Sequence, residues 1–116
     1  MTMRVAIVGS GPTGLYTFQK LIQSAEPLSI YIFEKGDRAG IGMPYTSDAN
    51  HRRMLANIAS IEIPSLEQSY FDWLSTLPRA ILRSYGVEPE TFDVRTFTPR
   101  MLLGEYYRAQ FVSLVA

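Results

Sequence analysis

Two short apolar runs separated by a helical pattern open the chain. Residues 4–8 and 28–33 are rich in β-branched and aromatic side chains and show no polar alternation, which is typical of parallel strands covered on both faces. Between them, apolar residues recur at helical spacing at Leu15, Phe18, Ile22 and Ala25. Pro12 suits the first turn of this helix, which is expected to end near Pro27. A helix joining two strands predicts a parallel βαβ unit over residues 1–34.

Residues 35–63 show no sustained period of either helix or strand. This stretch contains several residues that favour turns and loops, namely its glycines, Pro44, Asn50 and Asn57. It is therefore predicted to be a long ordered loop, and a loop of this length inside a domain usually has a functional role.

Three helices are predicted in residues 64–116, which form a helical segment. Ser65 and Gln68 have the spacing of a capping box for a first helix, in which Phe71, Leu74 and Leu77 share a face up to Pro78. A second helix covers 79–85 and stops at Gly86. Thr98 and Pro99 suit the N-cap and first turn of the last helix. Its apolar side carries Leu103, Tyr107, Phe111 and Leu114. A third strand over 91–98 is conceivable by alternation, between Pro89 and Pro99.

The turn after the first strand carries the pattern G-x-G-x-x-G. Its residues are Gly9, Ser10, Gly11, Pro12, Thr13 and Gly14, and Glu34 follows the second strand twenty positions after the last glycine. A strand before the glycines, a helix after them and an acidic residue at this distance are together the context of a dinucleotide-binding fingerprint.

Each glycine of such a fingerprint, and the acidic residue that follows it, has its own physical role. Gly9 allows a tight turn, Gly11 lacks the Cβ atom that would collide with a pyrophosphate, and Gly14 lets helix and strand approach. The N-terminus of the helix offers N–H groups and a positive dipole end to the phosphates. Glu34 can accept hydrogen bonds from the adenosine ribose and would repel a 2′-phosphate, so NADP is disfavoured at this turn.

Composition excludes several other classes of function. Eleven basic and eleven acidic residues cancel, and the longest basic run is the pair Arg52 and Arg53, so nucleic acid and anionic membranes are not indicated as partners. The chain has no cysteine, and no apolar stretch approaches the length of a membrane span. A protein of the cytoplasm is expected.

Other candidate sites in the sequence are weak. His51 is the one histidine and the chain has no cysteine, so no second histidine or cysteine ligand supports a metal site. Ser47 and Ser60 have no base associated with them by spacing, and nucleophilic catalysis is unsupported. No Gly-Lys-Ser/Thr follows the glycines, which excludes a Walker-type phosphate loop. No catalytic acid or base is assigned.

The chain resembles the FAD-NAD(P)-binding proteins, a branch of the two-dinucleotide-binding-domain flavoproteins related to N-hydroxylating monooxygenases. The segments that carry the likeness, in family order, are Val5–Leu15, Ile32–Lys35, Gly40–Tyr45, Met54–Ile58, Phe71–Leu74, Pro99–Arg100 and Gly104–Tyr106. The resemblance implies FAD at the fingerprint turn and NAD(P)H as a co-substrate.

The resemblance also implies further cofactor contacts. Gly42, Pro44, Tyr45, Leu55 and Asn57 would lie along the flavin half, Lys35 would follow the ribose-binding Glu34, and Arg100 would lie near cofactor or substrate. From the residues themselves, glycines permit close backbone approach, tyrosine can stack and asparagine can both donate and accept hydrogen bonds.

The sequence thus predicts an α/β, Rossmann-like unit with additional C-terminal helices, read as one incomplete FAD/NAD(P)-binding domain over residues 1–116. A two-stranded sheet is marginal without further strands. The chain alone is therefore expected to bind flavin weakly or not at all, and to be inactive. The leading function is the FAD-binding N-terminal part of a flavin-dependent oxidoreductase, with a monooxygenase as one form. An NAD-binding dehydrogenase domain and a non-enzymatic nucleotide-binding regulatory module are the alternatives.

Overall fold

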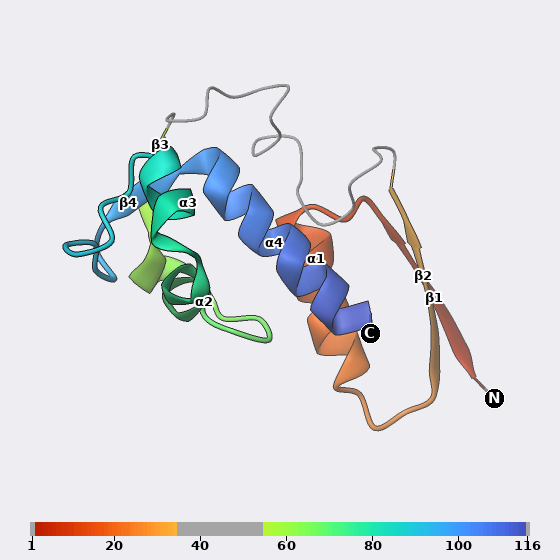
Figure 1. Ribbon diagram of the computed structural model, residues 1–116. Helices are drawn as coiled ribbons and strands as arrows, with labels where there is room; N and C mark the ends of the chain where they lie inside the picture. Colours follow the sequence, from red (N-terminus) through yellow and green to blue (C-terminus); the bar gives the residue numbers. More distant parts are fainter. Residues whose placement is uncertain (1, 35–54, 116) are drawn as a thin grey trace.

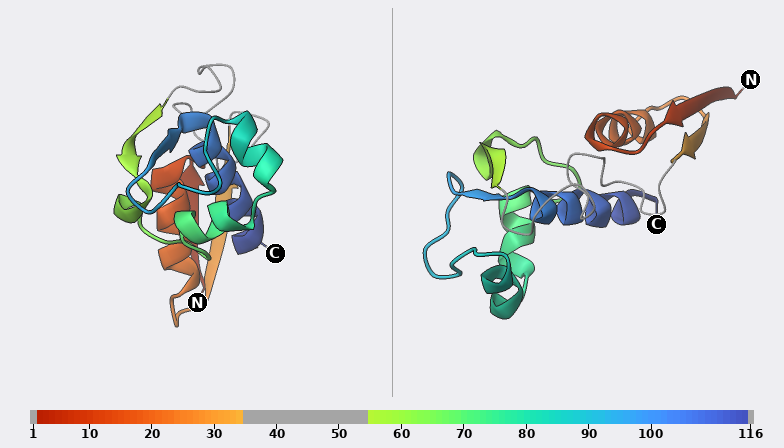
Figure 2. Two further views of the ribbon diagram at one scale, coloured as in Figure 1. Left: turned by 60° about the vertical axis from the view of Figure 1, so that its left-hand side comes forward. Right: turned by 90° about the horizontal axis from the view of Figure 1, so that it is seen from above.

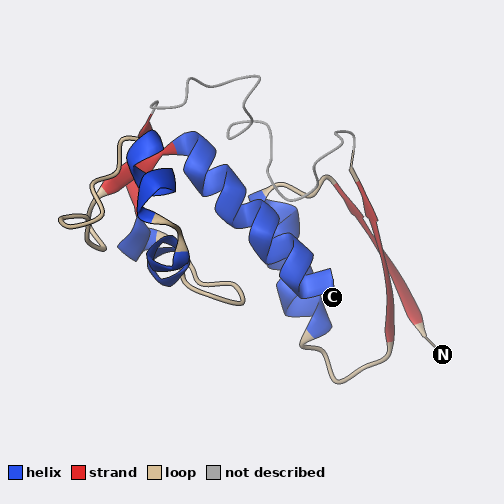
Figure 3. Ribbon diagram, in the orientation of Figure 1, coloured by secondary structure: helices blue, strands red, loops and turns tan. Residues whose placement is uncertain are grey.

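A computed structural model describes residues 2–34 and 55–115, and in these residues the chain forms a mixed α/β structure (Figure 1). The elements are β1 (Met3–Val8), α1 (Pro12–Ile22), β2 (Leu28–Phe33), β3 (Leu55–Ala59), the 3₁₀ turn η2 (Ser60–Glu62), α2 (Tyr70–Thr76), α3 (Arg79–Ser84), β4 (Phe97–Pro99) and α4 (Arg100–Val115). Helices make up most of the second half, as Figure 3 shows.

The predicted βαβ unit is present. β1 and β2 pair in parallel, with Met3 opposite Leu28 and Val8 opposite Phe33, and α1 joins them. The helix ends at Ile22, so the prediction that it continues nearly to Pro27 was wrong. The Ser24 side chain accepts a hydrogen bond from the backbone N–H of Glu26 at 3.1 Å, which stabilises a turn in place of another helical turn.

The two faces of the β1–β2 sheet differ in burial. Ile7 is buried, and Ile30 and Ile32 pack against the same core on one face. On the other face, Val8 is 86% exposed and Phe33 is 57% exposed. The expectation of strands covered on both faces is therefore wrong for the structure as described.

A second, antiparallel sheet joins two segments that are far apart in sequence. β3 pairs with β4, with Leu55 opposite Pro99 and Ala59 opposite Phe97, and the register is irregular between these pairs. The prediction of a loop over the whole of 35–63 was thus wrong at β3, and β4 overlaps only the end of the strand that alternation suggested over 91–98. Five residues with a central asparagine carry no periodic signal, and the partner strand that stabilises them lies outside any local window.

Two helix starts also differ from the prediction. α2 begins after Ser69, whose Oγ accepts a hydrogen bond from the N–H of Asp72 at 3.1 Å, whereas Ser65 lies four residues earlier. α4 begins at Arg100, because Thr98 and Pro99 belong to β4.

α4 is the central element of the core, and its apolar surface is wider than the predicted single stripe. Its buried residues are Leu102, Leu103, Gly104, Tyr106, Tyr107, Gln110 and Leu114. The reason is that α4 packs against α1 on one side and α2 on the other, as the view from above in Figure 2 shows. A helix with two packing partners needs two apolar faces.

Aromatic rings connect these helices through the core. Trp73 on α2 lies with its ring centroid 5.7 Å from that of Tyr106 on α4. Tyr106 is 5.4 Å from Tyr107, which in turn is 6.0 Å from Tyr16 on α1. The hydroxyls are bonded as well: Tyr16 donates to the carbonyl of Pro64 and Tyr106 donates to that of Gln68, both at 2.6 Å. These contacts fix the segment before α2 against α1 and α4.

Candidate functional site

The turn after β1 begins with a glycine that its backbone conformation requires. Gly9 has a φ of +88°, in the left-handed region that other residues avoid. Its N–H donates a hydrogen bond to the carbonyl of Phe33 at 2.7 Å. The turn therefore leaves β1 sharply while staying attached to the end of β2.

The last glycine of the fingerprint is required by packing. A Cβ atom built on Gly14 would lie 2.3 Å from the carbonyl oxygen of Gly9 and 3.2 Å from a methyl carbon of Ile7. Both distances are shorter than ordinary contacts between such atoms. Glycine at this position thus lets the first turn of α1 lie directly against the end of β1.

The middle glycine is different, because its backbone conformation is available to any residue. Gly11 is the N-cap of α1, with φ −70° and ψ −172°, and it has no side chain that could cap the helix. Pro12 follows at the first helical position and lacks an N–H group. The N–H groups of Thr13 and Gly14 stand in the first turn, where an α-helix supplies no backbone acceptor. This end of α1 is consequently an array of donors without a capping side chain.

Ser10 and Glu34 are joined directly. The backbone N–H and the hydroxyl of Ser10 both donate to the same carboxylate oxygen, Oε1 of Glu34, at 2.9 and 2.6 Å. Ser10 is 1% exposed, whereas the Glu34 side chain is exposed. The structure therefore brings the acidic residue at the end of β2 to the glycine turn, as the spacing indicated.

Leu55 at the start of β3 and Arg100 at the start of α4, which the resemblance placed near the cofactor, are in contact. Nε of Arg100 donates to the carbonyl oxygen of Leu55 at 3.1 Å, which fixes the start of α4 to the start of β3. Asn57 lies within β3, and its side chain is outside the described residues, as are Lys35, Gly42, Pro44 and Tyr45. Figure 1 shows β3 and β4 at the opposite end of α4 from β1 and β2, so the described candidates form two separate groups.

A cavity of about 420 Å³ adjoins the second group. Its lining residues are Leu55, Tyr85, Gly86, Val87, Glu88, Thr91, Phe92, Thr96, Phe97 and Pro99. This cavity could not be predicted from the sequence, because most of its lining residues lie in the non-periodic stretch between α3 and β4. The aromatic residues of this stretch show no periodic spacing, and they are brought together only when β3 and β4 pair.

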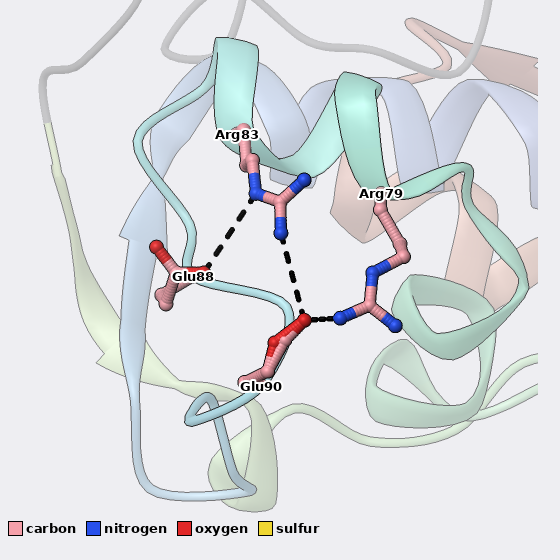
Figure 4. Close-up of polar contacts among 4 residues, drawn as sticks. All are labelled: Arg79, Arg83, Glu88 and Glu90. Carbon is pink, nitrogen blue, oxygen red and sulfur yellow. Dashed lines mark ion pairs between the residues drawn. The ribbon is translucent and has the colours of Figure 1, made fainter.

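Ion pairs hold the chain on one side of this cavity (Figure 4). Glu88, which lines it, is 3.8 Å from Nε of Arg83 on α3. Glu90 pairs with Arg79 and lies 3.5 Å from the guanidinium of Arg83. The acidic residue of the lining is therefore paired, and the lining combines aromatic and apolar residues with two threonines, Thr91 and Thr96.

A metal-binding group of side chains and a membrane-spanning helix are both absent from residues 2–34 and 55–115. No group of three or more histidine, cysteine, aspartate or glutamate side chains there is arranged to hold a metal ion. None of the helices within 2–34 and 55–115 combines the length and the apolar character that crossing a membrane demands.

Comparison with known proteins shows to which family the chain belongs. The family model described as FAD-NAD(P)-binding matches residues 6–116. The "Uncharacterized protein YdhS" of Escherichia coli (strain K12) is 54% identical to the chain over 112 residues, which are 97% of this chain and 21% of that relative. No solved structure matches the chain. The chain thus spans about a fifth of the relative, and the matched family covers the glycine turn, Glu34 and the second sheet. The chain belongs to the FAD-NAD(P)-binding family.

Proposed function

We propose that the glycine turn of this chain holds the adenosine diphosphate half of FAD, and that the chain is the FAD-binding N-terminal part of a flavin-dependent oxidoreductase. The observation that carries the proposal is the difference between the three glycines. Backbone conformation requires Gly9 and packing requires Gly14, but the conformation of Gly11 does not require glycine. A ligand that approaches the N-terminus of α1 closely would explain why residue 11 is a glycine, since a side chain there would collide with it.

The pyrophosphate is the part of the cofactor that suits this position. The first turn of α1 offers the N–H groups of Thr13 and Gly14 and the positive end of the helix dipole, and no side chain caps the helix. Two phosphates carry the acceptor oxygens and negative charge that such an end lacks. The N–H groups of Thr13 and Gly14 would hold the phosphates, and the absence of a side chain at Gly11 would leave room for them.

The ribose would then lie toward the end of β2. Glu34 is bonded to Ser10 of the same turn, so a ligand seated on the turn has the carboxylate beside it. A carboxylate accepts hydrogen bonds from vicinal hydroxyls and repels a phosphate on the same sugar. The site therefore favours FAD or NAD over NADP.

The choice of FAD over NAD rests on the family resemblance. When bound, FAD would supply the redox chemistry, which is acceptance of a hydride from NAD(P)H and transfer of electrons to oxygen or to a substrate. The proposed flavin-side contacts are Lys35, Gly42, Pro44, Tyr45, Leu55, Asn57 and Arg100. Of these, Arg100 and Leu55 are held together beside an aromatic-lined cavity. A monooxygenase is the specific form that we propose, in a protein of the cytoplasm.

The test is equilibrium binding to the purified chain, with ADP, FAD, NAD and NADP as separate probes up to millimolar concentration. We expect ADP, FAD and NAD to bind the isolated chain weakly, through their common half, and NADP to bind more weakly still. Gly11→Val should abolish binding of all four while circular dichroism shows the same helix content. Equal binding of ADP by the wild type and Gly11→Val would refute the proposed seat of the pyrophosphate. FAD that binds no more tightly than ADP to a chain extended to the length of the relative would refute the assignment of FAD.

A further inference from the structure

The cavity beside the second sheet has a wall that the chain itself holds in place. Backbone hydrogen bonds run from Val87 to the carbonyl of Leu82 at 2.9 Å and from Phe92 to that of Glu88 at 3.1 Å. The Phe92 ring also packs against Phe71 of α2, with 5.4 Å between the ring centroids. The cavity is therefore preformed, and its volume of about 420 Å³ lies in the usual range of sites for small organic molecules.

Apolar side chains of the lining remain partly exposed to solvent. Leu55 is 54% exposed and Phe97 is 50% exposed, although both line the cavity. Pro99, which also lines it, is the pairing partner of Leu55 in the second sheet. A ligand with an aromatic or aliphatic body would remove part of this apolar surface from water, and such burial is a major source of affinity.

Arg100 supplies a positive charge at the edge of the cavity. It follows Pro99 in the chain, and its Nε donates to the carbonyl oxygen of Leu55 at 3.1 Å. The terminal nitrogens of this guanidinium make no ion pair with a carboxylate of residues 2–34 or 55–115. A guanidinium with such donors suits a carboxylate, which it can bind through two N–H groups.

The acidic residue of the lining does not cancel this charge. Glu88 lies 3.8 Å from Nε of Arg83, so its carboxylate faces a cation of α3. Glu90 contacts both Arg83 and Arg79, and the four side chains drawn in Figure 4 are together neutral. Arg100 thus adds a positive charge beside a cluster that has no net charge.

Asp93 is a further carboxylate close to the lining, and it is held by its own turn. Its Oδ1 accepts hydrogen bonds from the N–H of Arg95 at 2.9 Å and from the hydroxyl of Thr96 at 3.2 Å. Asp93 is not among the residues that line the cavity. Its charge is therefore directed to the turn at residues 93–96.

We propose that this cavity binds a small organic carboxylate, with its aromatic or aliphatic body on Leu55 and Phe97 and its carboxylate at Arg100. The bond from Nε to Leu55 would hold the guanidinium in one orientation while its terminal nitrogens bind the ligand. This site goes beyond the proposed function. The glycine turn belongs to the β1–β2 end of the molecule, and Figure 1 shows that end at the far side of α4 from the second sheet.

The test is titration of the purified 116-residue chain with 1-naphthoate, followed by amide NMR spectra, with 1-naphthylmethylamine as the cationic counterpart. We expect a Kd on the order of 1 mM for 1-naphthoate, which is typical of a ligand of this size. The largest shifts should fall in residues 85–99. The amine should bind roughly fivefold more weakly or less, because it lacks the charge that pairs with a guanidinium. Equal or tighter binding of the amine, or shifts that are largest elsewhere, would overturn the proposal.

Phe97→Ala and Arg100→Gln each remove one proposed contact, and each should raise the Kd for 1-naphthoate about three- to tenfold. Tyr31→Ala is the matched control for the ring, because Tyr31 is 51% exposed on β2. Arg95→Gln is the control for charge, because Arg95 precedes β4 but does not line the cavity. Neither control should change the Kd, and the same spectra show that each variant is folded. Controls that weaken binding as much as their counterparts would contradict the assigned contacts.

Riboflavin and ADP separate this proposal from the proposed function. Riboflavin represents the competing occupant, since Leu55 and Arg100 are also proposed flavin-side contacts, and its displacement of 1-naphthoate would assign the cavity to the flavin ring and overturn the proposal. ADP should bind without displacing 1-naphthoate. Binding of 1-naphthoate by a chain that binds no ADP would refute the proposed function alone, and the reverse result would refute the carboxylate site alone.

Discussion

The carbonyl oxygen of Gly9 occupies the space that a Cβ atom of residue 14 would need, since the two atoms would be only 2.3 Å apart. Gly14→Ala must therefore push α1 away from β1 or change the turn. We expect it to lower the free energy of unfolding by about 1–3 kcal/mol, the usual range for overpacking. Urea denaturation followed by circular dichroism measures this change.

Gly11→Ala is the matched control for that substitution. It adds the same methyl group three residues earlier, at a backbone conformation open to any residue. Its cost should stay near the roughly 1 kcal/mol or less that alanine loses at an N-cap. Equal destabilisation by the two variants would contradict the packing role of Gly14.

Glu34→Ala should weaken binding of ADP by about 1.5–3 kcal/mol, the scale of hydrogen bonds to a charged group. It should also reduce the difference in affinity between NAD and NADP, because the charge that repels a 2′-phosphate is lost. Calorimetric titration with the two dinucleotides measures both effects. An unchanged ratio of their dissociation constants would show that Glu34 does not face the ribose.

Gly86→Ala should destabilise the end of α3 by about 1–2 kcal/mol, because Gly86 has a φ of +81°. The helix ends with hydrogen bonds from Gly86 to Arg83 and from Val87 to Leu82, both 2.9 Å, in the pattern of a Schellman motif. Gly86→Asn should cost less, since asparagine tolerates this region better. Thermal unfolding that ranks alanine as no worse than asparagine would argue against a backbone cause.

Stability should fall at alkaline pH because buried tyrosines resist ionisation. Burial raises the pKa of Tyr106 to about 12 and also raises the pKa of Tyr70. The unfolded chain ionises near the ordinary value of 10.0, so this contribution is complete below about pH 10 and is lost as pH rises toward 12. Each unit corresponds to about 1.4 kcal/mol.

Tyr106→Phe should reduce that alkaline loss, and at neutral pH it should cost about 1 kcal/mol through the bond to the carbonyl of Gln68. Unfolding free energies measured between pH 8 and 11 give both the loss of the hydrogen bond, at the low end of this range, and the change in the alkaline loss of stability. Tyr31→Phe, at a position 51% exposed, serves as the control and should leave the slope as it is. If the free energy of unfolding of Tyr106→Phe fell more steeply with pH than that of the wild type, ionisation of Tyr106 would not explain the alkaline loss.

Glu90→Gln tests the ion pairs beside the cavity. Glu90 contacts Arg79 and Arg83, but the side chains in these pairs are about half exposed. Such pairs contribute about 0–1 kcal/mol and are screened by salt. We expect a loss within this range that disappears in 1 M salt, as measured by urea denaturation at two ionic strengths. A larger loss that salt does not reduce would mean that the loop after α3 depends on Glu90 for more than charge.

The first third of the chain could be predicted because its signals are local. An apolar strand, a glycine turn and an amphipathic helix each show in a short window, and the acidic residue follows at a fixed distance. The contact between Ser10 and Glu34 could not be predicted in the same way. Spacing brings the two residues near each other, but only the three-dimensional turn shows that both donors of Ser10 are directed to one oxygen.

The second half was less predictable because its elements depend on distant partners. β3 is a strand through pairing with β4, and α2 starts after Ser69 because the Oγ of Ser69 accepts a hydrogen bond from the N–H of Asp72. A local rule placed the cap at Ser65, where the residue type was suitable, but the residues before Ser69 are held by the bonds from Tyr16 to Pro64 and from Tyr106 to Gln68. The flavin-side candidates were likewise assigned by likeness, and of these the described residues show the contact between Arg100 and Leu55.

Trp73 is the one tryptophan in a chain with seven tyrosines, and it lies at the head of the aromatic series that runs through Tyr106 and Tyr107 to Tyr16. Light absorbed by these phenol rings is therefore expected to be emitted largely by a single indole. That transfer depends on α1, α2 and α4 remaining docked. The chain consequently carries its own optical reporter, in which the ratio of tyrosine to tryptophan emission follows the assembly of the core without any added label.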